Sequence, residues 1–359
     1  MKTLSICLLT AAAACLASMA VDRLARQSIS SMLGRGMTIE KAQMFTQLTS
    51  SQGLMFDTPA EHSYRLELFS RNVDSVTQLN IDYAHKASER GEVLSGDMFE
   101  VNHMSHLSDE EFRAQLEGLR LSEEIEVSDY TQRHPLGSES VETQQEYKIA
   151  SGLGRIPFKT HIQDQVKCGG CWAFAMALSL EKLVYDKIGI QYNLSMQHLI
   201  DCNYKNNGCY GGDPAFAAEY ARQNGLPFNS EYPFVGQEST CRRTHRTVKF
   251  GNKIGPIHEF PIIPRVQYLA SKLYIPIAIS VDLSFRHLSN TDDVYVPNVN
   301  LCATASSHAV TIVNATSHYF EIQNSWSIKW GHFGKKKIKY CAMNVLMGSP
   351  SIMFPPILV

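Results

Sequence analysis

The chain contains 359 residues, of which 44% are hydrophobic and 19% charged, and this length allows two compact domains or one large domain with an additional segment. Its formal net charge of −2 excludes both the bulk basicity of many nucleic-acid-binding proteins and the acidic excess of a disordered tail. The cysteine count of nine is odd, and no cysteine lies between positions 16 and 167.

The N-terminal segment is typical of a secretory signal peptide. Lys2 supplies a positive charge, an almost wholly apolar run extends to Leu16, and Ser18 and Ala20 place small residues where a signal peptidase reads. A buried or membrane-spanning helix is the weaker alternative, because charged residues follow at once and the apolar run is shorter than about 20 residues. We therefore expect cleavage after Ala20, no later membrane segment, and cysteines that pair in an oxidising compartment.

Residues 21 to about 118 are predicted to be helical. Capping boxes at Thr58–Glu61 and Ser108–Glu111 both precede apolar residues at helical spacing. From Leu119 to Lys148 the apolar residues follow neither a helical nor a strand periodicity. Acidic residues together with a proline and a glycine predict an exposed linker there. Three later runs are predicted as strands: Pro276–Leu283, His308–Ala315 and His318–Ser325.

Cys171 is expected at or near the N-terminus of a helix, because apolar residues at helical spacing run from Trp172 to Tyr185. There the helix dipole and unpaired N–H groups favour thiolate over thiol. The spacing of Cys168 and Cys171 also fits a redox motif or half of a zinc site. However, a redox motif would need a βαβ context and a zinc site would need a second cluster of ligands, and the sequence shows neither.

A thiolate nucleophile needs a general base, and the base needs an orienting group. Among the thirteen histidines, His308 opens one strand-like run, and Asn324 ends the next. If these runs pair as a hairpin, His308 and Asn324 lie on neighbouring strands, where the Asn side chain can accept a hydrogen bond from the imidazole. Each residue alone has a structural explanation, but the combination favours nucleophilic catalysis.

The sequence around these residues resembles the active-site blocks of papain-like cysteine proteases, at Gln165–Phe174, Ser307–Val310 and Asn324–Gly331. The resemblance extends to a set of residues on one predicted helical face, which is similar to the interspersed motif of cathepsin L-like propeptides: Glu61, Arg65, Phe69, Asn72, Val76 and Asn80. Within the family, the chain is similar to the group 1 allergens of mites, at Thr240–Arg243, Ser284–Leu288 and Met343–Val359.

The resemblance implies a two-lobed α+β papain-like fold, with a helical left lobe around Cys171, a β-barrel right lobe, and a helical propeptide in front. The expected domains are a signal peptide at 1–20, an inhibitory propeptide with its activation linker at 21–147, and a peptidase domain at 148–359. The implied function is a secreted zymogen of a cysteine endopeptidase that cleaves proteins or peptides through a thiolate–imidazolium pair and an acyl-thioester intermediate. The implied compartment is extracellular, digestive or lysosome-like.

The same resemblance implies no cofactor, no metal site, no nucleic-acid partner and no membrane association after signal removal. The propeptide is the expected intramolecular inhibitor, and cystatin-type inhibitors are candidate partners. Low pH is expected to promote maturation by protonating carboxylates of the linker and the propeptide.

Four catalytic roles follow from the resemblance. Cys171 would be the nucleophile, and His308 would be its base and later the acid. Asn324 would orient His308, and Gln165 would donate its side-chain amide to the oxyanion together with the N–H of Cys171. Trp326 would shield the His–Asn hydrogen bond from solvent.

Substrate-binding positions are implied as well. They comprise the cleft and specificity-pocket residues Gly169, Gly211, Gly212, Asp213, Pro214, Ser280, Ala309 and Trp326. Glycines there allow close approach of the substrate backbone. Asp213 would either favour a basic substrate side chain or be a solvated residue at the rim. Three positions depart from the family pattern. Gly170 stands where Ser is common, Ser307 where Asn or Asp is usual, and Ser327 where Gly is usual.

The family pattern leaves Cys171 as the free thiol and implies three disulfides: Cys168–Cys209, Cys202–Cys241 and Cys302–Cys341. Two sequons are candidate glycosylation sites. Asn193 precedes a helix and is expected to be exposed, whereas Asn314 closes a strand and is expected to be partly buried.

Two alternative functions remain open. A catalytically impaired paralogue that acts as a binding or decoy protein would not be labelled by a thiol-directed epoxide. A disulfide oxidoreductase would need Cys168 to be free.

Overall fold

The computed structural model describes residues 37–116, 158–244, 246–250, 258–259, 274–297, 306–339 and 352–353. The predicted signal peptide and linker, together with Cys302 and Cys341, lie outside these residues. None of the helices in this described part is long and apolar enough to cross a membrane.

The predicted propeptide, described over residues 37–116, contains α2 (Ile39–Gln52), α3 (Pro59–Glu89) and α4 (Asp109–Leu116). The side-chain hydroxyls of Thr58 and Ser108 accept hydrogen bonds from the N–H groups three residues later, as the capping boxes predict. Between α3 and α4 the helical prediction is wrong. The backbone there pairs with another segment, and Phe99 forms an antiparallel bridge with Leu288.

The helical lobe is built around the predicted helix that starts at the cysteine. It contains α6 (Cys171–Ile188), α7 (Met196–Cys202), η1 (Gly208–Tyr210), α8 (Pro214–Asn224) and a short ribbon of β1 (Leu226–Pro227) and β2 (Thr247–Val248). Nearly every side chain of α6 is buried, so this helix is the centre of the lobe's core. Disulfides join Cys168 to Cys209 and Cys202 to Cys241, which are the first two pairs that the resemblance implies.

The sheet lobe contains an antiparallel sheet of four strands in the order β4 (Ile275–Val281), β5 (Ser306–Ala315), β6 (Tyr319–Gln323) and β7 (Lys335–Lys339). Besides the sheet, the lobe holds η3 (Leu283–His287) and the pair β3 (His258–Glu259) and β8 (Ile352–Met353). The three strand predictions are confirmed, with ends shifted by a few residues. The hairpin of β5 and β6 brings His308 and Asn324 to the same end of the sheet.

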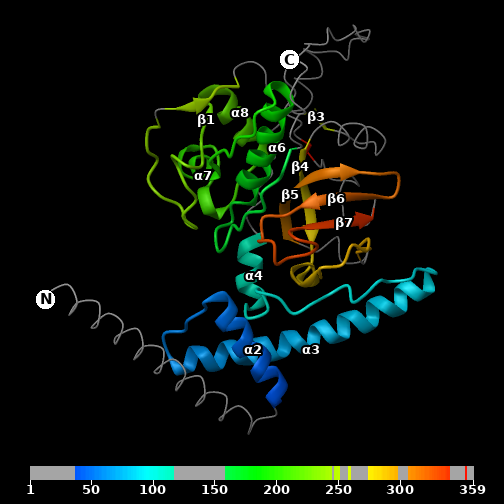
Figure 1. The fold of residues 1–359 in the computed structure, drawn as a ribbon. Coiled ribbons are helices and arrows are strands. Elements are labelled where there is room, and N and C mark those ends of the chain that lie inside the picture. Colours follow the sequence, from blue (N-terminus) through cyan, green and yellow to red (C-terminus); the bar gives the residue numbers. More distant parts are fainter. Residues whose placement is uncertain are drawn as a thin grey trace, which may run out of the picture.

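The propeptide shares a hydrophobic core with the sheet lobe. Side chains of α3, α4 and the segment between them pack with residues of η3 and the sheet in one cluster, which includes Tyr83, Phe99, Phe112, Phe285, Leu288, Tyr295 and Trp326. In Figure 1, α3 lies beneath the sheet, and α4 lies between α3 and the junction of α6 and β5. Helix α4 therefore packs against β5 and η3 of the sheet lobe at this junction.

Candidate active site

Cys171 is the first residue of α6 and is fully buried, in contact with Ala175 of the same helix and Ala309 of β5. Its N-cap, Gly170, makes no side-chain capping bond, so N–H groups of the first turn face the thiol. A Cβ at position 170 would lie 3.0 Å from Cδ1 of Ile200 and 3.3 Å from Sγ of Cys168. The glycine that departs from the family pattern therefore fits the tight packing of this chain.

His308 and Asn324 form the predicted pair. The Nε2 atom of His308 lies 2.9 Å from Oδ1 of Asn324, and both side chains are buried. Because an amide oxygen only accepts, Nε2 carries the proton, and Nδ1 is left as an acceptor with no hydrogen-bond partner among the described residues. Trp326 stacks on the His308 ring at a centroid distance of 4.6 Å, so it shields the pair from solvent.

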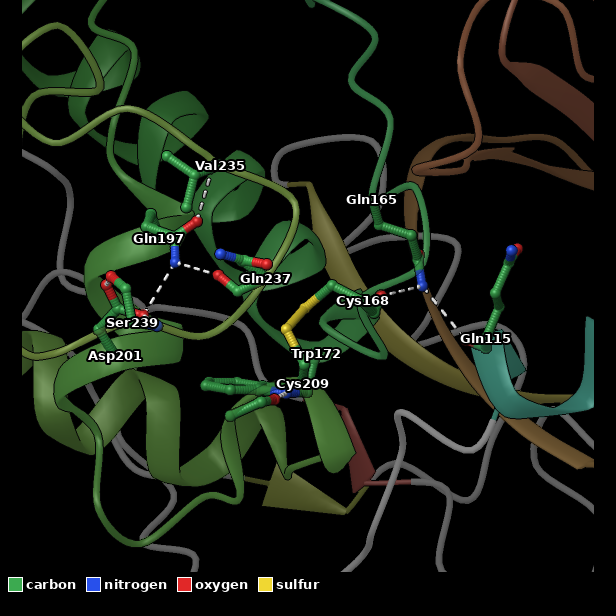
Figure 2. Close-up of a disulfide and its surroundings, with 11 residues drawn as sticks. Gln115, Gln165, Cys168, Trp172, Gln197, Asp201, Cys209, Val235, Gln237 and Ser239 are labelled. Carbon is green, nitrogen blue, oxygen red and sulfur yellow. Dashed lines mark hydrogen bonds between the residues drawn. A yellow bond between two sulfur atoms is a disulfide. The ribbon is translucent and has the colours of Figure 1, made fainter. Parts of the chain in front are cut away.

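Gln165 is buried and presents its side-chain amide to the propeptide. Its Nε2 donates to the backbone oxygens of Cys168 at 3.0 Å and of Gln115 at 3.2 Å, while its Oε1 accepts from Ser325 Oγ. Figure 2 shows Gln115 on α4 facing this amide. A carbonyl of the propeptide therefore takes the hydrogen bond that the resemblance assigns to the oxyanion of the substrate.

The covered site holds a neutral pair. Burial raises the pKa of the Cys171 thiol to about 12, although nearby backbone N–H groups act in the opposite direction. Burial also lowers the pKa of His308 to about 4, despite the hydrogen bond that it donates to Asn324, which raises it. The expected thiolate is therefore wrong for the covered state, because loss of water outweighs the helix dipole.

The substrate-binding glycines have internal roles too. Gly211 has a φ of 112°, and a Cβ on Gly212 would come within 2.8 Å of Trp172 and within 2.6 Å of Asn206. Gly169 donates its N–H to the oxygen of Cys209 at 2.9 Å. Gly211 and Gly212 are therefore needed for the chain to fold back on α6, whereas the backbone hydrogen bond of Gly169 does not itself require glycine.

Asp213 differs from both interpretations of the sequence. Its carboxylate accepts a hydrogen bond from the N–H of Ala215 and caps α8, and the residue is fully buried. Pro214 is the first residue of that helix. The Asp-Pro pair is itself a helix-start signal, which sequence reasoning missed here. Ser280 and Ala309 lie on neighbouring strands, and Ala309 contacts Cys171.

Both sequon asparagines are exposed. The expectation that Asn314 is partly buried is wrong, because a register shift in the pairing of β5 with β6 falls between Ile312 and Asn314. Asn193 lies just before α7, as expected.

The face of α3 that carries the propeptide motif contacts the segment between α3 and α4, which pairs with the sheet lobe. Asn80 both donates to and accepts from the backbone of Phe99, Asn72 donates to the oxygens of Ser105 and Leu107, and Arg65 forms a bidentate ion pair with Glu111. The motif therefore fixes the path of the chain between α3 and α4.

Two carboxyls of the propeptide respond to acid in opposite directions. The hydrogen bond from Arg65 lowers the pKa of Glu111 to about 2, so this ion pair persists in mildly acidic conditions. Burial raises the pKa of Glu100, and a carboxyl that is more easily protonated in the folded state gains stability on acidification. The linker carboxylates lie outside the described residues.

Three further residues were not singled out from the sequence. Gln115 supplies the carbonyl at Gln165, and Arg286 is a buried cation between the sheet lobe and α4. Glu181 is a buried carboxyl on α6 that faces His161. No local pattern marks them, since each depends on contacts between distant segments. In the part of the chain that the structure describes, no cluster of three or more ligating side chains could hold a metal ion.

Comparison with known proteins gives two family matches. Residues 156–347 match the family described as "Papain family cysteine protease", and residues 49–112 match the "Cathepsin propeptide inhibitor domain (I29)". Digestive cysteine proteinase 1 of Homarus americanus is 30% identical over 290 residues, which cover 77% of this chain and 83% of that protein.

Solved structures show the same fold. The digestive procathepsin L2 proteinase from Tenebrio molitor larval midgut has a TM-score of 0.65 at 21% identity, covering 89% of this chain and all of the other. A structure described with the mite allergens Blo t 1 and Der p 1 has a TM-score of 0.59 at 23% identity, covering 86% of this chain and 97% of that chain.

Proposed function

Because the chain belongs to the papain family of cysteine proteases and carries that family's inhibitory propeptide, we propose that Cys171 and His308 hydrolyse peptide bonds once the propeptide has left. The single observation that carries this assignment is the His308–Asn324 hydrogen bond of 2.9 Å beside a cysteine that begins a helix. It fixes the imidazole tautomer so that Nδ1 can take the thiol proton.

The proposed mechanism uses this geometry step by step. With the site hydrated, the thiol proton moves to Nδ1 of His308, and the Cys171 thiolate attacks the scissile carbonyl carbon. The oxyanion accepts hydrogen bonds from the Gln165 side chain and the Cys171 N–H. His308 then protonates the leaving amine as the C–N bond breaks. Water, deprotonated by His308, finally cleaves the thioester and restores the thiol.

In the zymogen, α4 opposes this reaction at the oxyanion site. The Gln115 carbonyl takes the amide hydrogen bond of Gln165 while Cys171 is out of contact with solvent. We propose that maturation cuts within the predicted linker, that residues 21–147 form the propeptide with its linker, and that residues 148–359 form the mature peptidase.

Secretion is part of the same proposal. Disulfides at Cys168–Cys209 and Cys202–Cys241 are typical of an oxidising compartment, and the exposed Asn193 and Asn314 suit glycosylation. Expression in a eukaryotic host should give protein in the culture medium that starts at Val21 and loses mass on glycosidase treatment. Recovery of uncleaved, intracellular protein would contradict it. Binding of cystatin-type inhibitors stays a prediction.

The test is a peptide-library digest by the matured protein. We expect cleavage by the wild type, none after Cys171→Ala, and a loss of about a hundredfold or more in kcat after Gln165→Ala. Because Cys171→Ala cannot process itself, it is matured by resin-bound wild-type enzyme. His318→Gln, at an exposed histidine, is the control for His308→Gln. An absence of cleavage by the wild type at every pH would favour the impaired paralogue instead.

A further inference from the structure

Arg286 is a cation of the sheet lobe whose side-chain partners come mainly from the propeptide. Its Nη2 lies 2.7 Å from Oδ1 of Asp109 and 3.1 Å from Oδ1 of Asn72, and its guanidinium lies over the Phe112 ring. Its remaining hydrogen bond, from Nε to Nε2 of His287, stays within the sheet lobe. Nη1 has no hydrogen-bond partner in the described part of the chain.

The position of Arg286 is fixed by the sheet lobe itself. Arg286 belongs to η3, where Asp282 caps the first turn by accepting from the N–H groups of Ser284 and Phe285. The indole of Trp330 donates to the oxygen of Phe285 at 2.8 Å and holds the other side of the turn. These contacts of the turn remain after the propeptide leaves, whereas the hydrogen bonds from Asn102 to the Arg286 oxygen and from the Glu100 N–H to the His287 oxygen are lost.

Removal of the propeptide would leave this cation without a carboxylate. With the propeptide in place Arg286 is only 4% exposed, and burial lowers its pKa while Asp109 opposes that shift. The ion pair with Asp109 therefore offsets part of the free-energy cost of burying the guanidinium in the zymogen. Without the propeptide, Arg286 thus has two guanidinium nitrogens free to donate and no acidic partner among the described residues of the peptidase.

The place of Arg286 along the cleft follows from the chemistry of His308. That residue protonates the leaving amine, so substrate residues after the scissile bond lie on the side of His308 and Trp326. Phe112 of the propeptide packs on Trp326 on this side at a centroid distance of 5.4 Å. Arg286 contacts the ring of Phe112 as well, so it lies on the leaving-group side of the scissile bond.

Helix α4 gives the distance from the scissile bond. Gln115 marks the place of the scissile carbonyl, and Asp109 marks the place of the carboxylate. Six residues of helix separate them by about 9 Å. An extended peptide covers about 9 Å in roughly three residues.

From this geometry we propose that Arg286 selects an acidic side chain at the second or third residue after the scissile bond. The proposal deepens the proposed protease function and rests on it. Asp109 occupies the place of that substrate carboxylate in the zymogen, so the propeptide competes with acidic substrates for the same cation.

The test scans internally quenched peptides of one sequence with Glu or Gln at each of the first four positions after the scissile bond. The enzyme is matured from the full chain, its active sites are titrated with a thiol-directed epoxide, and the cleaved bond is located by mass spectrometry. We expect kcat/KM to favour Glu by about fivefold to tenfold at the second or third position, and less at high salt. Equal rates at all four positions would overturn the proposal.

Variants connect the preference to the residue. In Arg286→Gln the Glu-to-Gln ratio should fall to about one, whereas Arg286→Lys should keep part of it. Since each ratio is taken within one enzyme, a general loss of activity cancels. A preference that survives Arg286→Gln would also overturn the proposal.

A charge exchange keeps the test possible if Arg286→Gln fails to fold. Asp109→Lys with Arg286→Glu retains an ion pair of reversed sign in the zymogen, and its mature form should prefer Lys at the same position. A peptidyl aminomethylcoumarin, which has no residues after the scissile bond, separates the two levels. No turnover of this substrate rejects the protease function, and turnover without a Glu preference rejects only the role of Arg286.

Discussion

At the scale of single residues, we predict that Cys171 changes state between the zymogen and the mature enzyme. In the zymogen it is a buried thiol with a pKa of about 12, so almost no thiolate forms at neutral pH. We predict that the zymogen is inert towards iodoacetamide at pH 7, whereas the mature enzyme is alkylated at Cys171 within minutes. Mass spectrometry of the modified peptide measures both.

The same experiment contains its own control, because Cys171 is the only free cysteine among the described residues. Alkylation in urea should proceed in both forms, which shows that the reagent is competent. Equal alkylation of the native zymogen and the native mature enzyme would contradict the prediction.

Ser327 shows that a departure from the family pattern has a local cost. Its φ of 68° lies in the left-handed region, directly after a bridge that joins Asp164 to Trp326. We predict that Ser327→Gly raises the free energy of unfolding by about 1 kcal/mol, because glycine adopts this conformation without a clash at Cβ. Urea denaturation of the Cys171→Ala zymogen measures it without self-digestion.

Gly53 offers the reverse substitution as a control. It has a φ of 62°, and a Cβ there would meet no atom within 4 Å. Gly53→Ala should therefore lower stability by a similar amount through backbone strain alone. A stability change of the same sign in both variants would contradict the argument.

At the scale of elements, the segment between α3 and α4 carries histidines that are poorly protonated in the folded state. Burial lowers the pKa of His103 and His106 to about 4, with Lys329 acting in the same direction on the first and Arg65 on the second. Glu111 on α4 acts in the opposite direction on His106 but does not reverse it. Acid would therefore force charge into this interface.

The sign of the effect follows from linkage. A histidine whose folded pKa lies below 6.5 binds fewer protons in the complex than after release, so the complex is fully stable above pH 6.5 and weakens down to about pH 4. We predict that His103→Gln with His106→Gln moves the pH of half-maximal self-activation down by about one unit. The activation rate across pH 3 to 7 is the measurement.

Both substitutions lie in the propeptide, so the mature enzyme is unchanged and its activity serves as an internal reference. His85→Gln, at an exposed histidine of α3, should not move the profile. A profile identical to that of the wild type in the double variant would exclude these histidines as the trigger.

The sequence predicted elements better than contacts. Thr58 and Ser108 marked helix starts because a capping hydroxyl acts within three residues, and β5 and β6 were readable from their apolar runs. The proposed catalytic residues were identified from the family resemblance and from the expected pairing of two neighbouring strands, and the structure shows that pairing. The Gln115 carbonyl at Gln165 was not predictable, because it depends on how two separately folded segments meet.

At the scale of the whole molecule, Glu181 makes the joining of the lobes sensitive to pH. Its carboxylate accepts from the N–H of Leu194 at 2.7 Å and lies 3.8 Å from His161, whose backbone oxygen accepts from Gln323 of the sheet lobe. Burial raises the pKa of Glu181 to about 8. The carboxyl is therefore neutral in the folded protein at pH 7.

This raised pKa predicts that stability falls as pH rises from 4.5 to about 8, by up to about 1.4 kcal/mol per pH unit, because only the unfolded chain ionises there. Glu181→Gln keeps an acceptor for Leu194 and should remove this slope. Melting temperatures of the Cys171→Ala zymogen between pH 5 and 8 measure it. The exposed Glu67→Gln is the control, and a slope that persists in Glu181→Gln would contradict the prediction.

The core that the propeptide shares with the sheet lobe couples the folding of the two parts of the chain. Phe99 and Phe112 are interior residues of the zymogen that pack with Phe285 and Leu288. If maturation removes the propeptide as proposed, these contacts no longer favour folding of the remaining chain. We therefore expect the mature protein to refold poorly once it has been unfolded.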